Sequence, residues 1–183
     1  MTRTVNPGLA EYMKTVDNAV SRACGVTYGD IYKDLHGDIT VMRETYESGL
    51  PAEDFVTRVI ADGNLAPVGD ADVASVRALN LRRASLVAFA AENPQWLMGA
   101  DRSLFTANDD GELFRMAPTL SKDGRGWGYA IDKVVSGSPS VDENGTVTLP
   151  EGAEFERMGA GLDIEDAIVA YETRLAPSAP GMH

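Results

Sequence analysis

The hydrophobic pattern of the chain changes once along its length, and this change constrains the fold more than any other feature. Up to about residue 92 the apolar residues recur at the 3.6-residue spacing of helices. Beyond Asn93-Pro94 the pattern becomes one of short apolar runs separated by turn residues. A helical first part followed by a small antiparallel sheet predicts an α+β fold.

The first part divides into short helices, because capping residues and glycines interrupt the helical pattern. Thr27 is expected to begin a helix, and Gly25, Gly49 and Gly63 are expected to end helices. Four short helices would form a small bundle before residue 65. A long helix is then expected from about residue 70 to Asn93-Pro94, with a mostly apolar stripe made of Val73, Val76, Leu79, Arg83, Leu86, Val87 and Ala90.

The second part contains two strong turn signals. Asp109-Asp110-Gly111 and Asn144-Gly145 each separate two short runs and predict hairpins. Strands are also expected over 126–135 and 151–158, and a closing C-terminal helix over 162–175. The predicted domains are a helical module at 1–65, an α+β domain at 66–175 and a tail at 176–183.

The charge of the chain limits its partners. It has 183 residues, of which 28 are acidic and 16 basic, so its formal net charge is −12. Such a charge repels nucleic acid and anionic membranes and favours a partner with a basic surface. We therefore expect neither direct nucleic-acid binding nor membrane association.

The location of the protein is inferred from cysteine content and hydropathy. Cys24 is the single cysteine, so no intramolecular disulfide can form, which fits a reducing compartment. No apolar run is long enough for a signal peptide or a transmembrane helix. We expect a cytoplasmic protein, or part of a particle assembled in the cytoplasm.

Residues 21–35 have nearly the spacing of a DNA-binding helix-turn-helix. The would-be recognition helix carries Asp30 and Asp34 against one lysine, and Gly29 weakens it by roughly 1 kcal/mol relative to alanine. Phosphate contacts supply most non-specific affinity for DNA, and an acidic helix makes few of them. The segment therefore favours a tight corner between two helices over a DNA reader.

The segment from Val20 to Leu65 carries a recurring pattern of helix punctuation. It has a glycine followed by an Asp-Ile pair, then an acidic-aromatic-acidic-x-Gly turn, then Pro-x-Glu opening a last helix. The residues concerned are Gly25, Asp30, Ile31, Asp34, Glu44, Tyr46, Glu47, Gly49, Pro51 and Glu53. In these features the segment, about a quarter of the chain, resembles a small uncharacterised acidic helical module found in phage and plasmid open reading frames. The resemblance implies a bacteriophage or mobile-element context and assigns no functional residue; the rest of the chain resembles no family.

The residue types that usually carry catalysis or bind metals are scarce and scattered. Cys24, His36 and His183 lack the paired spacing of a zinc site, and the turn at 108–112 lacks the ligand positions of an EF-hand. His36 beside Gly37 is expected to satisfy the C-terminal carbonyls of a helix, and Cys24 is expected in the core. The sequence therefore predicts no catalytic residue, no metal and no cofactor.

A glycine-rich stretch at 122–129 offers Lys122 and Arg125 beside backbone amides that could hold an anion. No helix follows it, so it does not match a P-loop, and a loop entering a strand is the simpler interpretation. If the chain were an enzyme, Arg125 and Trp127 would be the first place to look.

Three classes of function remain. The favoured one is a non-enzymatic acidic interaction protein of a phage or mobile element, which binds and inhibits a host protein. Its sharpest form is an anti-defence inhibitor of a nucleic-acid-handling enzyme, with carboxylates imitating a phosphate backbone. The alternatives are a virion or assembly structural protein, which binds itself or other virion proteins, and an enzyme of unknown class.

Candidate interface residues are large aromatic anchors and runs of acids. They are Tyr28, Tyr32, Tyr46, Trp96, Trp127, Glu151, Glu154, Glu156, Asp163, Glu165 and Asp166. Core packing is the competing interpretation for the aromatic residues. For Asp163–Asp166, the competing interpretation is simple stabilisation of a helix N-terminus.

Overall fold

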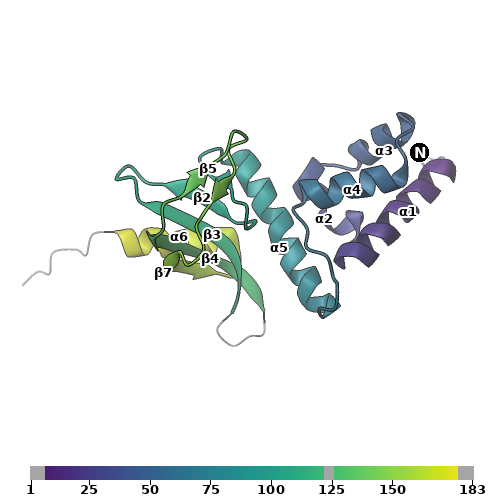
Figure 1. The fold of residues 1–183 in the computed structure, drawn as a ribbon. Coiled ribbons are helices and arrows are strands. Elements are labelled where there is room, and N and C mark those ends of the chain that lie inside the picture. The colour runs from purple at the N-terminus through teal and green to yellow at the C-terminus, as the bar shows by residue number, and fades with distance from the viewer. Residues whose placement is uncertain (1–6, 122–125, 177–183) are drawn as a thin grey trace, which may run out of the picture. The chain divides into compact units, whose positions relative to one another are not determined.

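The computed structural model describes residues 7–121 and 126–176 and confirms the α+β fold (Figure 1). The chain divides into two compact units, Met1–Ala91 and Glu92–His183. This division differs from the predicted boundary after Leu65, because nearly all of the long helix belongs to the first unit. The predicted tail, apart from Ala176, lies outside the described residues.

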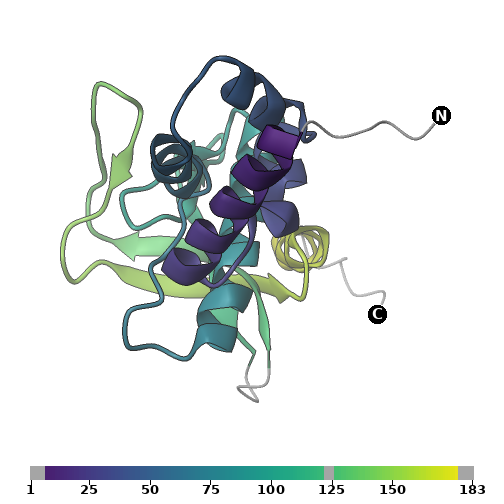
Figure 2. The ribbon, with the colours of Figure 1, turned by 90° about the vertical axis from the view of Figure 1, so that its right-hand side faces the viewer.

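The first unit is helical. Its elements are α1 (Pro7–Cys24), α2 (Tyr28–His36), α3 (Thr40–Glu47), α4 (Ala52–Asp62) and α5 (Val73–Glu92). Helix α1 contacts α2, α3 and α4 and is seen in front of them in Figure 2. As predicted, Thr27 begins α2: its side chain accepts from the amide of Asp30, whose carboxylate accepts in return from the amide of Thr27. The core includes Val16, Val20, Cys24, Tyr28, Ile31, Met42, Phe55, Val59 and Leu65, all buried.

One buried polar side chain joins α5 to the rest of the first unit. Asn80 is 0% exposed, and its amide group donates to the carbonyl oxygens of Cys24 at 2.7 Å and Ala66 at 2.8 Å. Its own side-chain oxygen accepts from the backbone N–H of Ala66 at 2.7 Å. The predicted apolar stripe is therefore wrong at two points, because Asn80 is buried while Val73 is 54% exposed. These bonds, together with the Arg77–Asp30 ion pair and the packing of Ala84 in the core, tie α5 to the first unit.

The second unit contains a five-stranded antiparallel sheet in the order β1-β2-β3-β4-β7. The strands are β1 (Leu97–Met98), β2 (Leu104–Ala107), β3 (Leu113–Leu120), β4 (Trp127–Ser136) and β7 (Glu154–Gly161). Both predicted hairpins are confirmed: β2 pairs with β3, and β5 (Ser140–Val141) pairs with β6 (Val147–Thr148). Strand β1 was not predicted.

Helix α6 (Ile164–Leu175) packs on one face of this sheet, over β7 and β4 (Figure 1). The ring of Phe114 lies 5.0 Å from the ring of Tyr171 on α6. A Cβ atom at Gly159 would lie only 2.6 Å from the backbone nitrogen of Tyr171. The absence of a side chain at Gly159 therefore lets the helix rest directly on β7.

Candidate functional site

The five aromatic residues predicted as interface anchors lie in different parts of the molecule. Tyr28 is fully buried, and the half-buried ring of Tyr32 stacks on it at 5.9 Å between centroids. Half-buried Tyr46 packs on Tyr12. In the second unit Trp96 is buried and Trp127, at the start of β4, is half-buried. The structure thus brings only Tyr28 and Tyr32 together, and Tyr28 belongs to the core.

His36 does not have the predicted contacts with helix carbonyls. Its Nε2 lies 3.4 Å from a carboxylate oxygen of Asp62, and its Nδ1 lies 3.1 Å from the hydroxyl of Tyr28. Because a carboxylate can only accept, Nε2 carries the hydrogen, and in the neutral ring Nδ1 accepts from the Tyr28 hydroxyl. At this end of α2 the carbonyl of Lys33 accepts from the backbone N–H of Gly37.

This buried hydroxyl gives a prediction for alkaline pH. Burial, with smaller contributions from Asp38 and Tyr32, raises the pKa of Tyr28 to about 12 from its ordinary value of 10.0. The folded protein therefore keeps a proton that the unfolded chain releases above pH 10. We expect the free energy of unfolding to fall by about 2 kcal/mol between pH 10 and pH 12 from this group. Urea unfolding of the wild type and of Tyr28→Phe at several pH values checks this, because the fall should be smaller in the variant; equal falls would contradict it.

The six acidic residues predicted as interface candidates are all exposed and all lie in the second unit. Asp163 accepts from the amide of Asp166 at 2.8 Å and begins α6, as a helix cap does. Glu156 pairs with Arg174 at 2.6 Å. The remaining four side chains make no ion pair with any described residue; they are Glu151, Glu154, Glu165 and Asp166.

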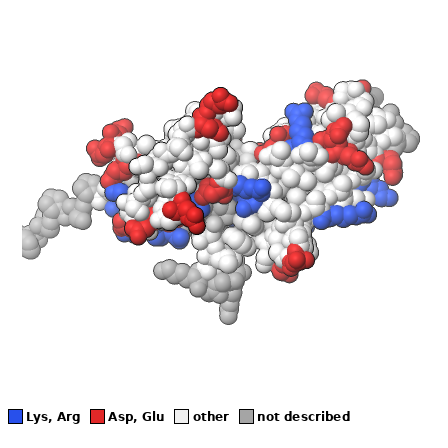
Figure 3. All heavy atoms as spheres, viewed as in Figure 1, with Lys and Arg blue, Asp and Glu red and all other residues white. Residues whose placement is uncertain are grey.

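The excess negative charge is concentrated in the second unit. It holds 16 acidic and 7 basic residues, against 12 and 9 in the first, so its formal charge is −9 and that of the first is −3. Its basic side chains at 115, 133, 157 and 174 are each paired with a carboxylate of the same unit. Figure 3 shows acidic groups at the surface, some of them with basic groups beside them. Much of the positive charge is thus already compensated within the unit.

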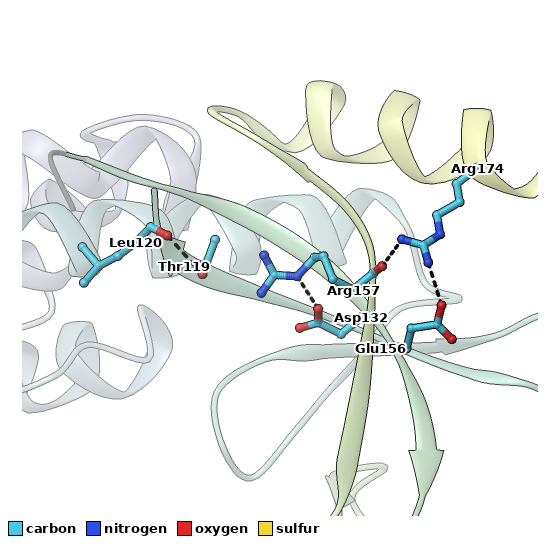
Figure 4. Close-up of polar contacts among 6 residues, drawn as sticks. All are labelled: Thr119, Leu120, Asp132, Glu156, Arg157 and Arg174. Carbon is cyan, nitrogen blue, oxygen red and sulfur yellow. Dashed lines mark hydrogen bonds and ion pairs between the residues drawn. The ribbon is translucent and has the colours of Figure 1, made fainter. Parts of the chain in front are cut away.

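Three of the paired charges form a row across the sheet. Arg115 on β3 is in register with Asp132 on β4, which is in register with Arg157 on β7. Side chains alternate between faces along a strand, so this row lies on the face opposite Phe114 and α6. Asp132 is only 7% exposed, and one of its oxygens accepts from Nε of Arg157 at 2.5 Å. A nearly buried carboxylate therefore holds the Arg157 guanidinium in place (Figure 4).

Each arginine of the row stands in a groove. The Arg115 groove has a volume of about 450 Å³ and is lined by Asp101, Arg115, Val147, Leu149, Pro150 and Phe155, among others. In it Arg115 donates to Asp101 and to Ser103, both at 2.8 Å, and lies over the ring of Phe155. The Arg157 groove has a volume of about 300 Å³ and is lined by Thr119, Leu120, Tyr129, Arg157, Ala160 and Leu162, among others. Sequence reasoning missed both grooves, since their walls come from strands far apart in the chain.

The remaining predicted features are inconspicuous. Lys122 and Arg125 of the glycine-rich stretch lie outside the described residues. In the turn at 108–112, Glu112 is bonded to Asn108 and Lys133, and these hydrogen bonds lower the pKa of Glu112.

No group of three or more potential ligands within 7–121 and 126–176 could hold a metal ion. In the same ranges, no helix is both long enough and apolar enough to span a membrane.

Comparison with known proteins adds no relative. No protein-family model, curated protein or solved structure matches this chain.

Proposed function

We propose that the chain is a non-enzymatic interaction protein, whose second unit binds a basic surface of another protein. The observation that carries this proposal is the set of exposed carboxylates at Glu151, Glu154, Glu165 and Asp166, which no described basic group neutralises. Fixed charges of one sign steer a partner of opposite sign and select against others. Since the unit pairs most of its own basic side chains internally, its acidic surface is left to attract a partner.

The partner we propose is a host protein. In the most specific version of this proposal, it is a nucleic-acid-handling defence enzyme. Such an enzyme has a basic groove for phosphates, and carboxylates can occupy it and block it. The resemblance of Val20–Leu65 to a phage and plasmid module supports this mobile-element context. The protein would then act in the cytoplasm of the host cell.

The test is a matched pair of charge variants in a pull-down from lysate of the host cell. The first replaces Glu151, Glu154 and Glu165 by Gln and Asp166 by Asn, which removes four exposed charges from the second unit. The control makes the same change in charge on the first unit, at the exposed residues Glu11, Glu44, Glu47 and Asp70. We expect the wild type and the control to retain one basic host protein at low salt, and the first variant to lose it about tenfold or more.

Two results would contradict the proposal. Equal loss in both variants would mean that total charge matters and the surface of the second unit does not. Recovery of only the protein itself or of phage particle proteins would instead favour a virion or assembly role.

A further inference from the structure

We propose that the Arg157 groove binds a small amphipathic carboxylate, that is, a single carboxylate group on an apolar body. The proposal is independent of the protein partner proposed above, because it concerns other residues and a different kind of ligand. It rests on three observations: an arginine with unused donors, a mainly apolar wall and a volume suited to a small molecule.

The carboxylate of the ligand would bind to the guanidinium of Arg157. Its Nε is bonded to Asp132, but its two terminal amino groups make no hydrogen bond to any residue of the described ranges. Figure 4 shows these two groups on the side of the guanidinium that faces Thr119. Two terminal N–H groups of one guanidinium match the two oxygens of a carboxylate. Because Asp132 already fixes the guanidinium, little side-chain entropy is lost when a ligand binds.

The site for the apolar body is the wall of the groove. Leu120 and Leu162 are 52% and 67% exposed, and Tyr129 beside them is nearly buried. Covering two such leucines removes apolar surface from water, which favours binding. The volume of about 300 Å³ lies at the lower end of the range for small-molecule sites. The groove thus fits a short acyl or aromatic acid.

The charge balance favours a monoanionic carboxylate over a phosphate ester. Asp132 offsets part of the charge of Arg157, and the whole unit carries a formal charge of −9. A dianionic phosphate would need more donors than one guanidinium and the Thr119 hydroxyl supply. A planar carboxylate needs only the two terminal amino groups.

The first experiment compares hexanoate with its neutral analogue hexanamide, by titration into the isotopically labelled full chain. Amide resonances of Thr119, Gly128 and Gly161, which line the groove, serve as reporters. We expect saturable shifts of these resonances with hexanoate, and affinity at least about tenfold weaker for hexanamide. Equal affinity for the two compounds, or shifts confined to other residues, would overturn the proposal.

The second experiment uses a matched pair of variants, because replacing Arg157 would leave Asp132 buried without its partner and could disrupt the fold. Leu162→Asp adds a negative charge at the rim of the groove. Val169→Asp adds the same charge at a 61% exposed site on α6 that does not line it. We expect hexanoate affinity to fall about tenfold in Leu162→Asp and to change less than about twofold in Val169→Asp. Equal affinity in both variants would refute binding in this groove.

Discussion

Asn80→Leu is expected to lower the stability of the first unit by about 3 kcal/mol or more. The substitution keeps a similar volume but removes three hydrogen bonds, to the carbonyls of Cys24 and Ala66 and from the amide of Ala66. Each of these backbone groups then remains in or near the core without its partner, at a cost of about 1–3 kcal/mol apiece. The connection between α1 and α5 is the part that we expect to open first.

Urea unfolding measures this loss, and two optical signals separate the units. Both tryptophans, Trp96 and Trp127, lie in the second unit, so their fluorescence follows that unit. Helical circular dichroism follows mainly the first, which contains α1 to α5. Asn18→Leu makes the same change at an exposed site on α1 and should alter stability by less than about 0.5 kcal/mol. A loss below about 1 kcal/mol for Asn80→Leu would contradict this interpretation of Asn80.

Gly159→Ala is expected to displace α6 and to destabilise the second unit by about 1–3 kcal/mol. The added methyl group would lie 2.6 Å from the backbone nitrogen of Tyr171 and 2.7 Å from the carbonyl oxygen of Ala167. Both atoms belong to the helix backbone, so no side-chain rotation can relieve the clash. The helix must therefore move away from β7 and lose contacts such as the Phe114–Tyr171 ring pair.

Tryptophan fluorescence during urea unfolding measures the expected loss of stability of the second unit in Gly159→Ala. Gly126→Ala is the control, because among the described residues a Cβ atom there meets only the Ser121 hydroxyl, at 4.0 Å, and no positive φ is found for this glycine. The control should unfold at the urea concentration of the wild type. If Gly159→Ala did so too, α6 would not rest on β7 as described.

Local features of the fold could be predicted from sequence, because they depend on neighbouring residues. Thr27 as a helix cap and Asn144-Gly145 as a hairpin turn are properties of a few consecutive residues, and both are confirmed. The division of the chain could not be predicted in this way. The long helix α5 joins the first unit through long-range contacts, such as the bonds of Asn80 to residues 14 and 56 positions away.

The candidate sites show the same contrast between features that depend on neighbouring residues and features that depend on distant ones. The acidic runs near β7 and α6 could be recognised as exposed, since charged residues in turns and first helical turns face water. The Arg115–Asp132–Arg157 row could not, because it requires the register of three strands. Strand β1, with only two residues, gives too short a pattern to recognise.

The most direct test of the proposed function is the affinity of the purified chain for its captured host partner, measured by calorimetry from low to high salt. Electrostatic recognition by the second unit predicts that affinity falls steeply with salt for the wild type and for the first-unit control variant. It predicts a weaker affinity and a shallower dependence for the variant without the charges of Glu151, Glu154, Glu165 and Asp166. An affinity that does not change with salt concentration, or that is equal in all three proteins, would contradict the proposal that the acidic surface is the basis of binding.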